Sequence, residues 1–285
     1  MGELMGVSIA AEVCCHVGRV RTNNEDNFFF NGFNLSKSFT HKGIVRRKRS
    51  DASVQLYAVC DGMGGQAAGE EASFIGTDMM HGLLRRLRNS ADPHIAIDDY
   101  TDEANKAVAK LDNGAGCTLA MVCIAEGKAI VSWLGDSRVY MLRSGKLRQL
   151  TQDHTEAERL RKLGIAAADK RSHNSLTRYL GMNMEGMVLT PSYCEPIAIK
   201  RNDMFLICSD GLTSMVNDEE IAAIMRESQK PAYDLVNAAL KAGGTDNVTA
   251  AVIGVESLKQ WQMKRSIKSR TVLALTLCMP FMQAR

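Results

Sequence analysis

The chain has 285 residues, of which 45% are apolar and 24% charged, and a formal net charge of +3. This length can form one large domain with a full core, and the ordinary composition excludes a fibrous or disordered protein, so we expect one globular domain with a tail. The net charge is too small to indicate nucleic-acid binding by bulk electrostatics, and no nucleic-acid partner is expected.

Short β-rich runs separated by turn residues predict a series of strands. Tight turns such as AEGK (125–128) and RSGK (143–146) join several of them, which favours antiparallel sheets. The strands are expected over residues 8–15, 27–33, 54–60, 117–125, 128–134, 138–143, 188–196, 203–208 and 248–255.

Amphipathic patterns predict helices in two separate blocks of the sequence. The first block covers residues 69–88 and 95–111, and the second covers 217–228 and 233–243. Acidic residues open the first turn of the third helix, and a glycine follows the fourth. Helices in two blocks and strands in several indicate an α+β sandwich.

Two stretches differ from this pattern. Residues 34–53 are polar and basic, with their densest charge at Arg46–Arg49, and are predicted to form a surface hairpin loop. This basic block is either simply solvated or contacts an acidic partner or a membrane. In the tail, the basic run 264–270 precedes an apolar segment, 271–282, that is shorter than the roughly 20 residues of a membrane-spanning helix. The tail either packs on the surface or is disordered, or it contacts a membrane.

The eight cysteines are predicted to be reduced. Cys14 and Cys15 would point to opposite faces of a strand, and four others lie within apolar runs. No C-x-x-C pair suggests a zinc site, and the N-terminus lacks the features of a signal peptide. A cytoplasmic location is therefore expected. The four cysteines in apolar runs are Cys60, Cys117, Cys123 and Cys208.

Four aspartates each lie at the end of an apolar run, beside a small residue or a turn: Asp61, Asp136, Asp210 and Asp246. Carboxylates that project from strand ends toward one spot are what a hard divalent cation requires. Taken alone, each aspartate could instead cap a turn, and Asp136 could pair with Arg138 at the surface. Together they predict a polynuclear metal site.

A further polar cluster precedes the aromatic run NFFF (27–30). Arg21, Glu25 and Asp26 could pair with one another in solution, but an exposed ion pair contributes only about 0–1 kcal/mol. Beside a metal site, the acids could instead hold metal-bound waters, and Arg21 could bind a phosphate through two parallel hydrogen bonds.

Seven ordered motifs resemble the bacterial branch of the PP2C (PPM) family of metal-dependent serine/threonine protein phosphatases. The resemblance covers about residues 8–256, so we expect a phosphatase domain over 1–256 and a tail over 257–285. It implies an α-β-β-α sandwich of two central antiparallel sheets flanked by helices, with a flap at about 154–175 beside the site. The motifs are R-x-x-N-E-D (21–26), D-G-M-G-G (61–65), G-C-T (116–118), G-D-S-R (135–138), L-T-R-Y-L-G (176–181), S-D-G-L (209–212) and G-T-D-N-V-T (244–249).

The resemblance also implies two Mn²⁺ or Mg²⁺ ions and a role for each motif residue. Asp61 would bridge both ions, Asp210 and Asp246 would complete the ligands of one, and the carbonyl oxygen of Gly62 would bind the other.

The remaining roles concern water, a further ion and phosphate. Glu25 and Asp26 would hold waters of the second ion, Asp136 with Asp210 matches a third, weaker metal site, and Arg21 matches the phosphate-binding arginine.

The implied reaction is hydrolysis of phosphoserine and phosphothreonine by a water shared between the two ions, without a covalent enzyme intermediate. The position of the leaving-group acid in animal members is Met63 here, so that acid is unassigned, and His154 is expected to make a structural hydrogen bond instead. Expected partners are a bacterial serine/threonine kinase and its substrates, and the chain is expected to be a monomer. The alternative is a catalytically silent, phosphatase-like module that binds phosphoproteins.

Overall fold

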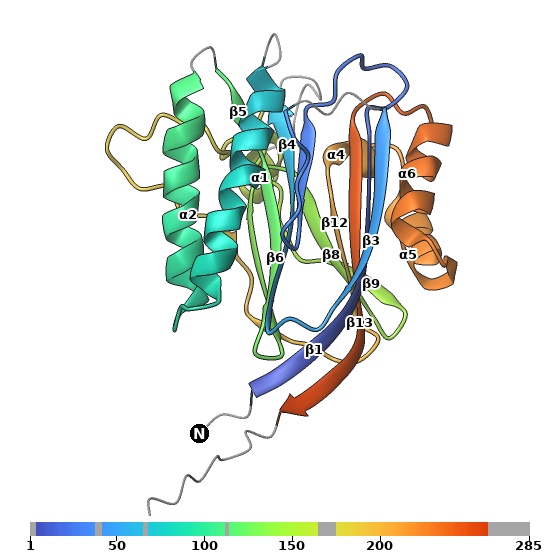
Figure 1. Cartoon of the computed structure of the whole chain (residues 1–285). Helices are drawn as coiled ribbons and strands as arrows, with labels where there is room; N and C mark the ends of the chain where they lie inside the picture. Colours follow the sequence, from blue (N-terminus) through green and yellow to red (C-terminus); the bar gives the residue numbers. More distant parts are fainter. Residues whose placement is uncertain (1–3, 38–41, 65–67, 112–113, 165–174, 262–285) are drawn as a thin grey trace, which may run out of the picture.

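Two antiparallel sheets are stacked face to face, and helices cover both outer faces (Figure 1). The computed structural model describes residues 4–37, 42–64, 68–111, 114–164 and 175–261. The predicted α-β-β-α sandwich is confirmed.

The first sheet has six antiparallel strands and joins the two ends of the described chain. Its first and last strands in sequence, β1 and β13, pair over their whole lengths near the middle of the sheet. Across the sheet the order is β3 (Gly43–Ser50), β1 (Leu4–His16), β13 (Val248–Trp261), β12 (Met204–Cys208), β8 (Arg138–Arg143) and β9 (Lys146–Gln149).

The second sheet is also antiparallel and is built mainly from the middle of the chain. Its order is β10 (Ser192–Tyr193), β7 (Lys128–Leu134), β6 (Leu119–Ala125), β4 (Val54–Met63) and β2 (Asp26–Phe30), with β11 (Ile197–Ala198) paired to β7 and β5 (Gly116–Cys117) paired to β4.

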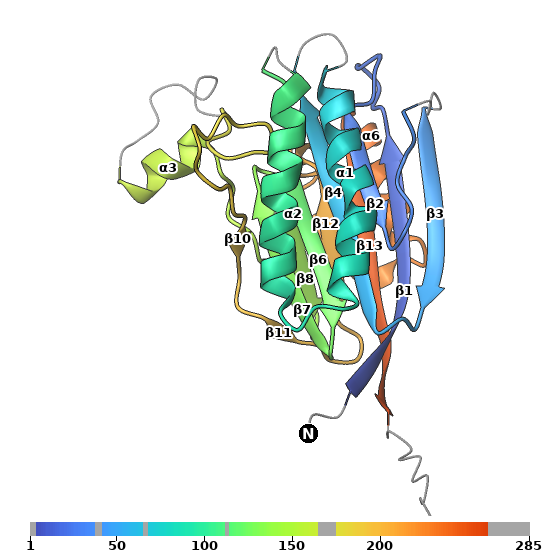
Figure 2. The same cartoon turned by 60° about the vertical axis from the view of Figure 1, so that its left-hand side comes forward.

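The helices fall into two groups, as the two blocks in the sequence predict. α1 (Ala68–Leu87) and α2 (Pro93–Val108), with the short 3₁₀ helix Ala109–Leu111, cover the second sheet, whereas α4 (Asp210–Thr213), α5 (Asp218–Glu227) and α6 (Pro231–Lys241) cover the first. Local sequence sets their starts: Asn217 accepts a 2.9 Å hydrogen bond from the Glu220 backbone N–H and caps α5. α3 (Glu156–Lys162) stands apart from both layers (Figure 2).

Alternating side chains of the strands fill three apolar layers. The middle layer between the sheets contains Phe28 and Phe205, and the outer layers lie beneath the two helix groups. Cys15 faces the middle layer and Cys14 the layer under α6, as predicted for adjacent residues of one strand. The cysteines within the described residues are all free, which agrees with the prediction that they are reduced.

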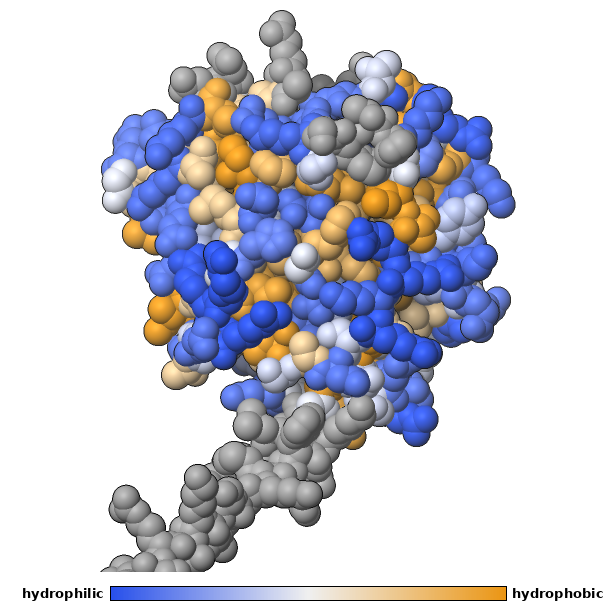
Figure 3. Space-filling view, in the orientation of Figure 1, coloured by the Kyte–Doolittle hydropathy of each residue, from blue (hydrophilic) through white to orange (hydrophobic). Residues whose placement is uncertain are grey.

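The prediction of a loop over 34–53 is wrong for Gly43–Ser50, which form the edge strand β3. A band of hydrophilic side chains crosses the surface over this strand (Figure 3). Positive charge on an edge strand discourages pairing with other chains. Each of its four consecutive cations has a local contact: Arg46 over the Phe33 ring at 3.7 Å, Arg47 with Glu12 at 3.2 Å, Lys48 with the Asn31 carbonyl at 3.3 Å, and Arg49 with Glu256 at 3.0 Å.

Other boundaries differ because short elements carry little periodicity. The strand expected over 188–196 is reduced to Ser192–Tyr193, and β9, β11, α3 and α4 were not predicted. β4 continues two residues past Asp61, since Gly62 and Met63 pair with β5.

The tail prediction lies mostly outside the described residues, which end at Trp261 on β13. The domain boundary at 256 and the fate of residues 264–285 stay predictions. Within the part of the chain that the structure describes, no helix is both long and apolar enough to cross a membrane.

Candidate metal centre

Strand register brings the predicted acids together in pairs. Asp26 lies directly opposite Asp61 in the antiparallel pair of β2 and β4. In the first sheet, Arg138 on β8 lies opposite Cys208 on β12. Asp136 and Asp210 are each two residues beyond this pair, where the strands end, and they lie near enough for the charge of Asp210 to raise the pKa of Asp136.

Two glycines allow the loops around these acids to approach closely. A Cβ atom at Gly62 would lie 2.1 Å from the Gly69 carbonyl oxygen, and one at Gly211 would lie 1.9 Å from that of Asn247. Any side chain at either position would push the backbone apart. The Gly62 N–H donates to the Glu25 carbonyl at 3.1 Å, and the Glu25 N–H donates to Asn247 Oδ1 at 2.7 Å.

Asp26 links the two sheets. Its Oδ2 accepts hydrogen bonds from Ser209 Oγ and Thr249 Oγ1, each at 2.7 Å, and the residue is only 3% exposed. Its other carboxylate oxygen, Oδ1, is buried and has no hydrogen-bond partner within the described residues. The sequence interpretation missed both hydroxyl groups, although each lies within a quoted motif, S-D-G-L or G-T-D-N-V-T.

The backbone of Asp61 is fixed by Thr118 of the G-C-T motif. The Asp61 N–H donates to Thr118 Oγ1 at 2.9 Å, and the Thr118 N–H donates to the Asp61 carbonyl at 2.8 Å. Thr118 Oγ1 also lies 2.7 Å from Ser137 Oγ of G-D-S-R. Asp61 is therefore tied to the turn that carries Asp136.

Burial and crowding raise the pKa of these carboxyl groups. Burial raises the pKa of Asp61 well above its usual range, and the charges of Asp26, Asp210 and Asp136 raise it further. The pKa of Asp26 and that of Asp136 rise to about 7, in each case mainly through burial. Burial and then Asp246 raise the pKa of Asp210. Without a cation, ionising all of these groups is unfavourable.

Two arginines do not form the local pairs that the sequence left open. Arg21 Nη2 lies 2.8 Å from Asp246 Oδ2, with the two side chains 50% and 35% exposed, and does not pair with Glu25 or Asp26. Arg138 pairs with Asp153 and not with Asp136. Arg21 thus lies at the open rim of the cluster, where a phosphate group could reach it.

His154 has the structural role that the sequence predicted. The Gly135 N–H donates to Nδ1 at 3.2 Å, so Nε2 carries the proton and donates to Ser192 Oγ at 3.0 Å. Burial, with the positive charges of Arg178 and Lys162, lowers the pKa of His154 to about 4. The neutral ring stacks on Trp133 at a centroid distance of 6.0 Å.

The oxygen-rich cluster fits Mg²⁺ or Mn²⁺. An unpartnered buried carboxylate oxygen and mutually raised pKa values are both relieved by a divalent cation. No three acidic, histidine or cysteine side chains among the described residues are arranged as ligands of a single ion. Mg²⁺ commonly takes only one or two carboxylates and keeps several waters, so a shared, sparse set of carboxylates suits it.

Comparison with known proteins gives a consistent result. The sequence model of the family "Protein phosphatase 2C" matches residues 13–248. Serine/threonine phosphatase stp of Listeria monocytogenes is 31% identical over 252 residues, covering 83% of this chain and 92% of the relative. Serine/threonine protein phosphatase PstP of Mycobacterium tuberculosis is 34% identical over 232 residues, covering 75% of this chain and 43% of the relative.

Solved structures agree. The catalytic domain of PstP, crystallised with two manganese ions, superposes with a TM-score of 0.70 at 28% identity, covering 88% of this chain and all of that one. The resemblance found in the motifs is confirmed, and the chain belongs to the protein phosphatase 2C family of metal-dependent serine/threonine phosphatases.

Proposed function

We propose that this chain removes phosphate from phosphoserine and phosphothreonine proteins at the carboxylate cluster described above, with Mn²⁺ or Mg²⁺ bound there. One observation carries the assignment of the site: acids from both sheets, which are buried or half-buried, converge at one end of the sandwich, and Asp26 has a buried carboxylate oxygen without a partner among the described residues. Asp61, Asp210 and Asp246 would hold the ions, with the Gly62 carbonyl.

Bound divalent cations would supply positive charge for the phosphoryl oxygens and lower the pKa of water. The chain's own residues orient the substrate. Arg21 is half exposed, and its guanidinium can exchange Asp246 for two phosphoryl oxygens, because arginine matches the planar geometry of such anions. Glu25 and Asp26 would hold waters beside the Gly62 carbonyl, and Asp136 with Asp210 would form a weaker cation site.

The test is phosphate release from a phosphothreonine peptide by purified protein in Mn²⁺, in Mg²⁺ and in EDTA. Release that needs metal and is lost in Asp246→Asn supports the proposal. Asp203→Asn is the matched control, since Asp203 is a buried acid at the other end of β12. Folded wild-type protein that releases no phosphate with excess Mn²⁺ would overturn the proposal and favour the silent, phosphoprotein-binding alternative. No observation at present favours that alternative, because every motif carboxylate is in place.

Further proposals concern the surroundings of the enzyme. The relatives are named serine/threonine phosphatases, which supports a role opposing a serine/threonine kinase. We also propose a cytoplasmic location, which the free cysteines support, and a monomeric state. The basic and apolar tail supports contact with a membrane. Cell fractionation of the full chain and of a chain lacking 264–285 tests the tail: an unchanged soluble distribution would remove that idea.

A further inference from the structure

The segment Thr151–Thr155 leads from β9 to helix α3 and is bonded at each residue to another part of the fold or to α3. Thr151 Oγ1 accepts from the Val139 N–H at 3.1 Å, and the Gln152 carbonyl accepts from Trp133 Nε1 at 2.8 Å. The backbone N–H of His154 donates to the Gly135 carbonyl at 2.9 Å. Thr155 caps α3, accepting from the Glu158 N–H at 3.3 Å.

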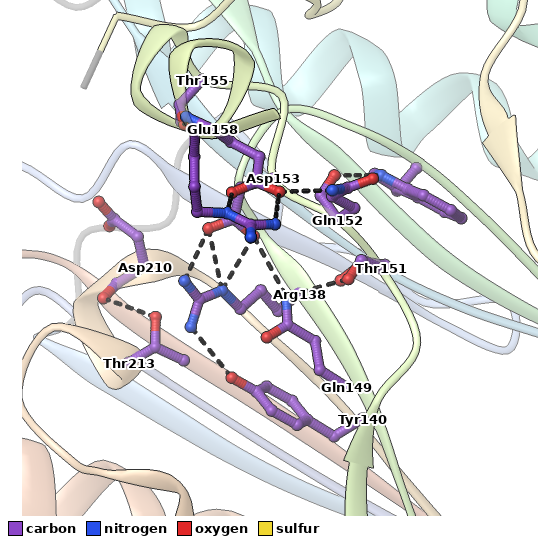
Figure 4. Close-up of polar contacts among 12 residues, drawn as sticks. Arg138, Tyr140, Gln149, Thr151, Gln152, Asp153, Thr155, Glu158, Asp210 and Thr213 are labelled. Carbon is purple, nitrogen blue, oxygen red and sulfur yellow. Dashed lines mark hydrogen bonds and ion pairs between the residues drawn. The ribbon is translucent and has the colours of Figure 1, made fainter. Parts of the chain in front are cut away.

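The charged contact of this segment is a two-armed ion pair between Arg138 and Asp153 (Figure 4). Arg138 Nε donates to Asp153 Oδ1 at 2.9 Å, and Nη2 donates to Oδ2 at 2.6 Å. Arg138 Nη1 donates to the Tyr140 hydroxyl at 3.1 Å, and Gln149 Nε2 lies 3.3 Å from Asp153 Oδ1. Both charged groups are mostly buried. Because two parallel hydrogen bonds join them, the pair fixes the orientation of the Asp153 carboxylate relative to the Arg138 guanidinium as well as the distance between the two groups.

The pair lies beside the carboxylate cluster. Arg138 follows Asp136 by two residues in the G-D-S-R turn, and Figure 4 shows Asp210 next to the network. The charge of Arg138 lowers the pKa of both Asp136 and Asp210, although burial outweighs it in each case. One guanidinium therefore contacts the segment Thr151–Thr155, through Asp153, and lies near two acids of the candidate metal centre.

Helix α3 depends on this segment because it has no apolar anchor. None of its residues is buried. Its contacts with its surroundings include the Gln152 side chain, which donates to Glu158, and the Glu156 N–H, which donates to the Ser175 carbonyl at 3.0 Å. A helix without buried side chains is held in place by the polar contacts at its start.

We propose that Arg138 and Asp153 form a positioning pair that holds the segment Thr151–Thr155, and with it α3, against the end of the sandwich that bears the carboxylates. The pair thereby determines how well a phosphoprotein chain, which extends beyond its phosphate, is bound. A small phosphate ester does not reach α3 and depends on the pair much less. This inference rests on the proposed function, and it assigns Arg138 to substrate positioning, not to the chemical step.

The same strand provides a matched control. At the other end of β8, Arg143 makes an equivalent two-armed pair with Asp203, with Nε to Oδ1 at 2.8 Å and Nη2 to Oδ2 at 2.6 Å. The arginine exposures are alike, 28% for Arg138 and 26% for Arg143. A conservative change at either arginine keeps the charge but removes the two-armed geometry.

The experiment compares Arg138→Lys with Arg143→Lys by steady-state kinetics in saturating Mn²⁺. The substrates are a phosphothreonine peptide and p-nitrophenyl phosphate. We expect Arg138→Lys to raise the KM for the peptide by about tenfold, with a much smaller change for the ester, because a small displacement of a positioning group weakens binding of the longer substrate. Arg143→Lys should leave both KM values near those of the wild type.

A second readout does not use activity. In metal-free protein, hydrogen exchange of amides in 151–164 should be about tenfold faster in Arg138→Lys and in Asp153→Asn than in the wild type or Arg143→Lys. The double variant should exchange no faster than either single one, since both changes break the same pair. If Arg138→Lys does not fold, Asp153→Asn takes its place in the kinetic comparison.

Unchanged peptide KM together with unchanged exchange in Arg138→Lys would overturn the proposal. A fall in kcat that is equal for both substrates would also overturn it, because Arg138 would then act on the reacting centre. If the wild type releases phosphate from neither substrate, the proposed function fails, whereas the exchange measurement still tests the positioning pair.

Discussion

The two ends of the sandwich treat acidic side chains in opposite ways. At one end, Asp61, Asp136 and Asp210 lie together, and burial and mutual repulsion raise their pKa values. At the other end, Asp203 accepts both arms of Arg143, and Glu256 pairs with Arg49 at 3.0 Å. At the second end these acids are neutralised within the fold, whereas Asp61, Asp136 and Asp210 have no ion-pair partner among the described residues, even though Asp153 beside them pairs with Arg138.

This difference indicates that the acids at the metal-centre end lower the stability of the metal-free fold, whereas those at the other end do not. A buried acid with a fixed arginine partner contributes to stability only through that partner, whereas crowded acids without cations oppose folding. Strain of this kind concentrates at functional sites and is offset elsewhere in the structure. Neutralising one acid at each end should therefore have opposite effects on stability.

Asp61→Asn should have the largest effect. We expect phosphatase activity to fall by about a hundredfold or more, because in the proposed site Asp61 is the ligand that both cations would share. In EDTA, however, the free energy of unfolding should rise, because one member of the repelling cluster is neutral. Urea unfolding in EDTA and phosphate release in Mn²⁺ measure the two effects. A less stable metal-free variant would contradict the comparison between the two ends.

Asp203→Asn should act in the opposite direction on stability. Asp203 is nearly fully buried and also accepts the Lys200 N–H at 2.6 Å, so losing its charge leaves Arg143 without a countercharge. The free energy of unfolding should fall by about 2–3 kcal/mol, with kcat/KM little changed. Urea unfolding with parallel kinetics provides the measurement, and unchanged stability would show that the pair contributes nothing net.

The pH dependence of the metal-free protein follows from the raised pKa values. Asp26 and Asp136 have a pKa of about 7 in the fold, above the ordinary carboxyl value of about 4, so the folded state binds their protons more tightly than the unfolded state. In EDTA, stability should fall as pH rises from about 4 to 7, by at most about 1.4 kcal/mol per pH unit for each group.

Saturating Mn²⁺ should reverse this trend, since metal binding requires ionised ligands and stabilises the folded state by mass action. Thermal unfolding at pH 5, 6, 7 and 8 with and without Mn²⁺ checks both parts. Metal-free stability that increases steadily over this range would argue against a repelling cluster.

His154→Asn should have the smallest effect. The pKa of His154 is lowered from 6.5 to about 4 in the fold, so its contribution to stability is full above pH 6.5 and is lost as pH falls toward 4. Asparagine keeps a hydrogen-bond acceptor at this position but does not titrate. We expect the wild type to be more stable by about 1 kcal/mol at pH 7, with this advantage shrinking toward pH 4 in parallel urea titrations. A constant difference would contradict the assignment.

Much of this architecture could be predicted from the sequence because its strands and main helices carry clear apolar periodicity. The four aspartates of the candidate metal centre could be predicted for the same reason, since each lies at one end of an apolar run. β3 could not be read, because its side chains are exposed or half exposed and leave no alternating apolar pattern. α3 has no buried face and so no apolar periodicity, and its helix signals are the cap at Thr155, the acidic first turn and the basic last turn, which a segment of seven residues carries too briefly to stand out.

The parts of the site that escaped prediction are contacts between motifs. Ser209 and Thr249 both bond to Asp26, which lies more than 180 residues away in the chain. The partner of Arg138 is Asp153, 15 residues further on, and no local spacing rule indicates it. The spacing of motifs therefore indicates which residues lie at the site. Which of these residues form hydrogen bonds with one another depends on tertiary packing, which the spacing does not show.

The pairing of β1 with β13 also has a consequence for biosynthesis. His16 lies opposite Val248, so a central ladder of the first sheet joins segments that are far apart in the chain. During synthesis, β1 cannot form this ladder until β13 has emerged from the ribosome, although its other edge can already pair with β3. Such distant pairing slows folding and leaves intermediates open to aggregation. Newly made chains of this protein should therefore depend on chaperones until β13 has been synthesised.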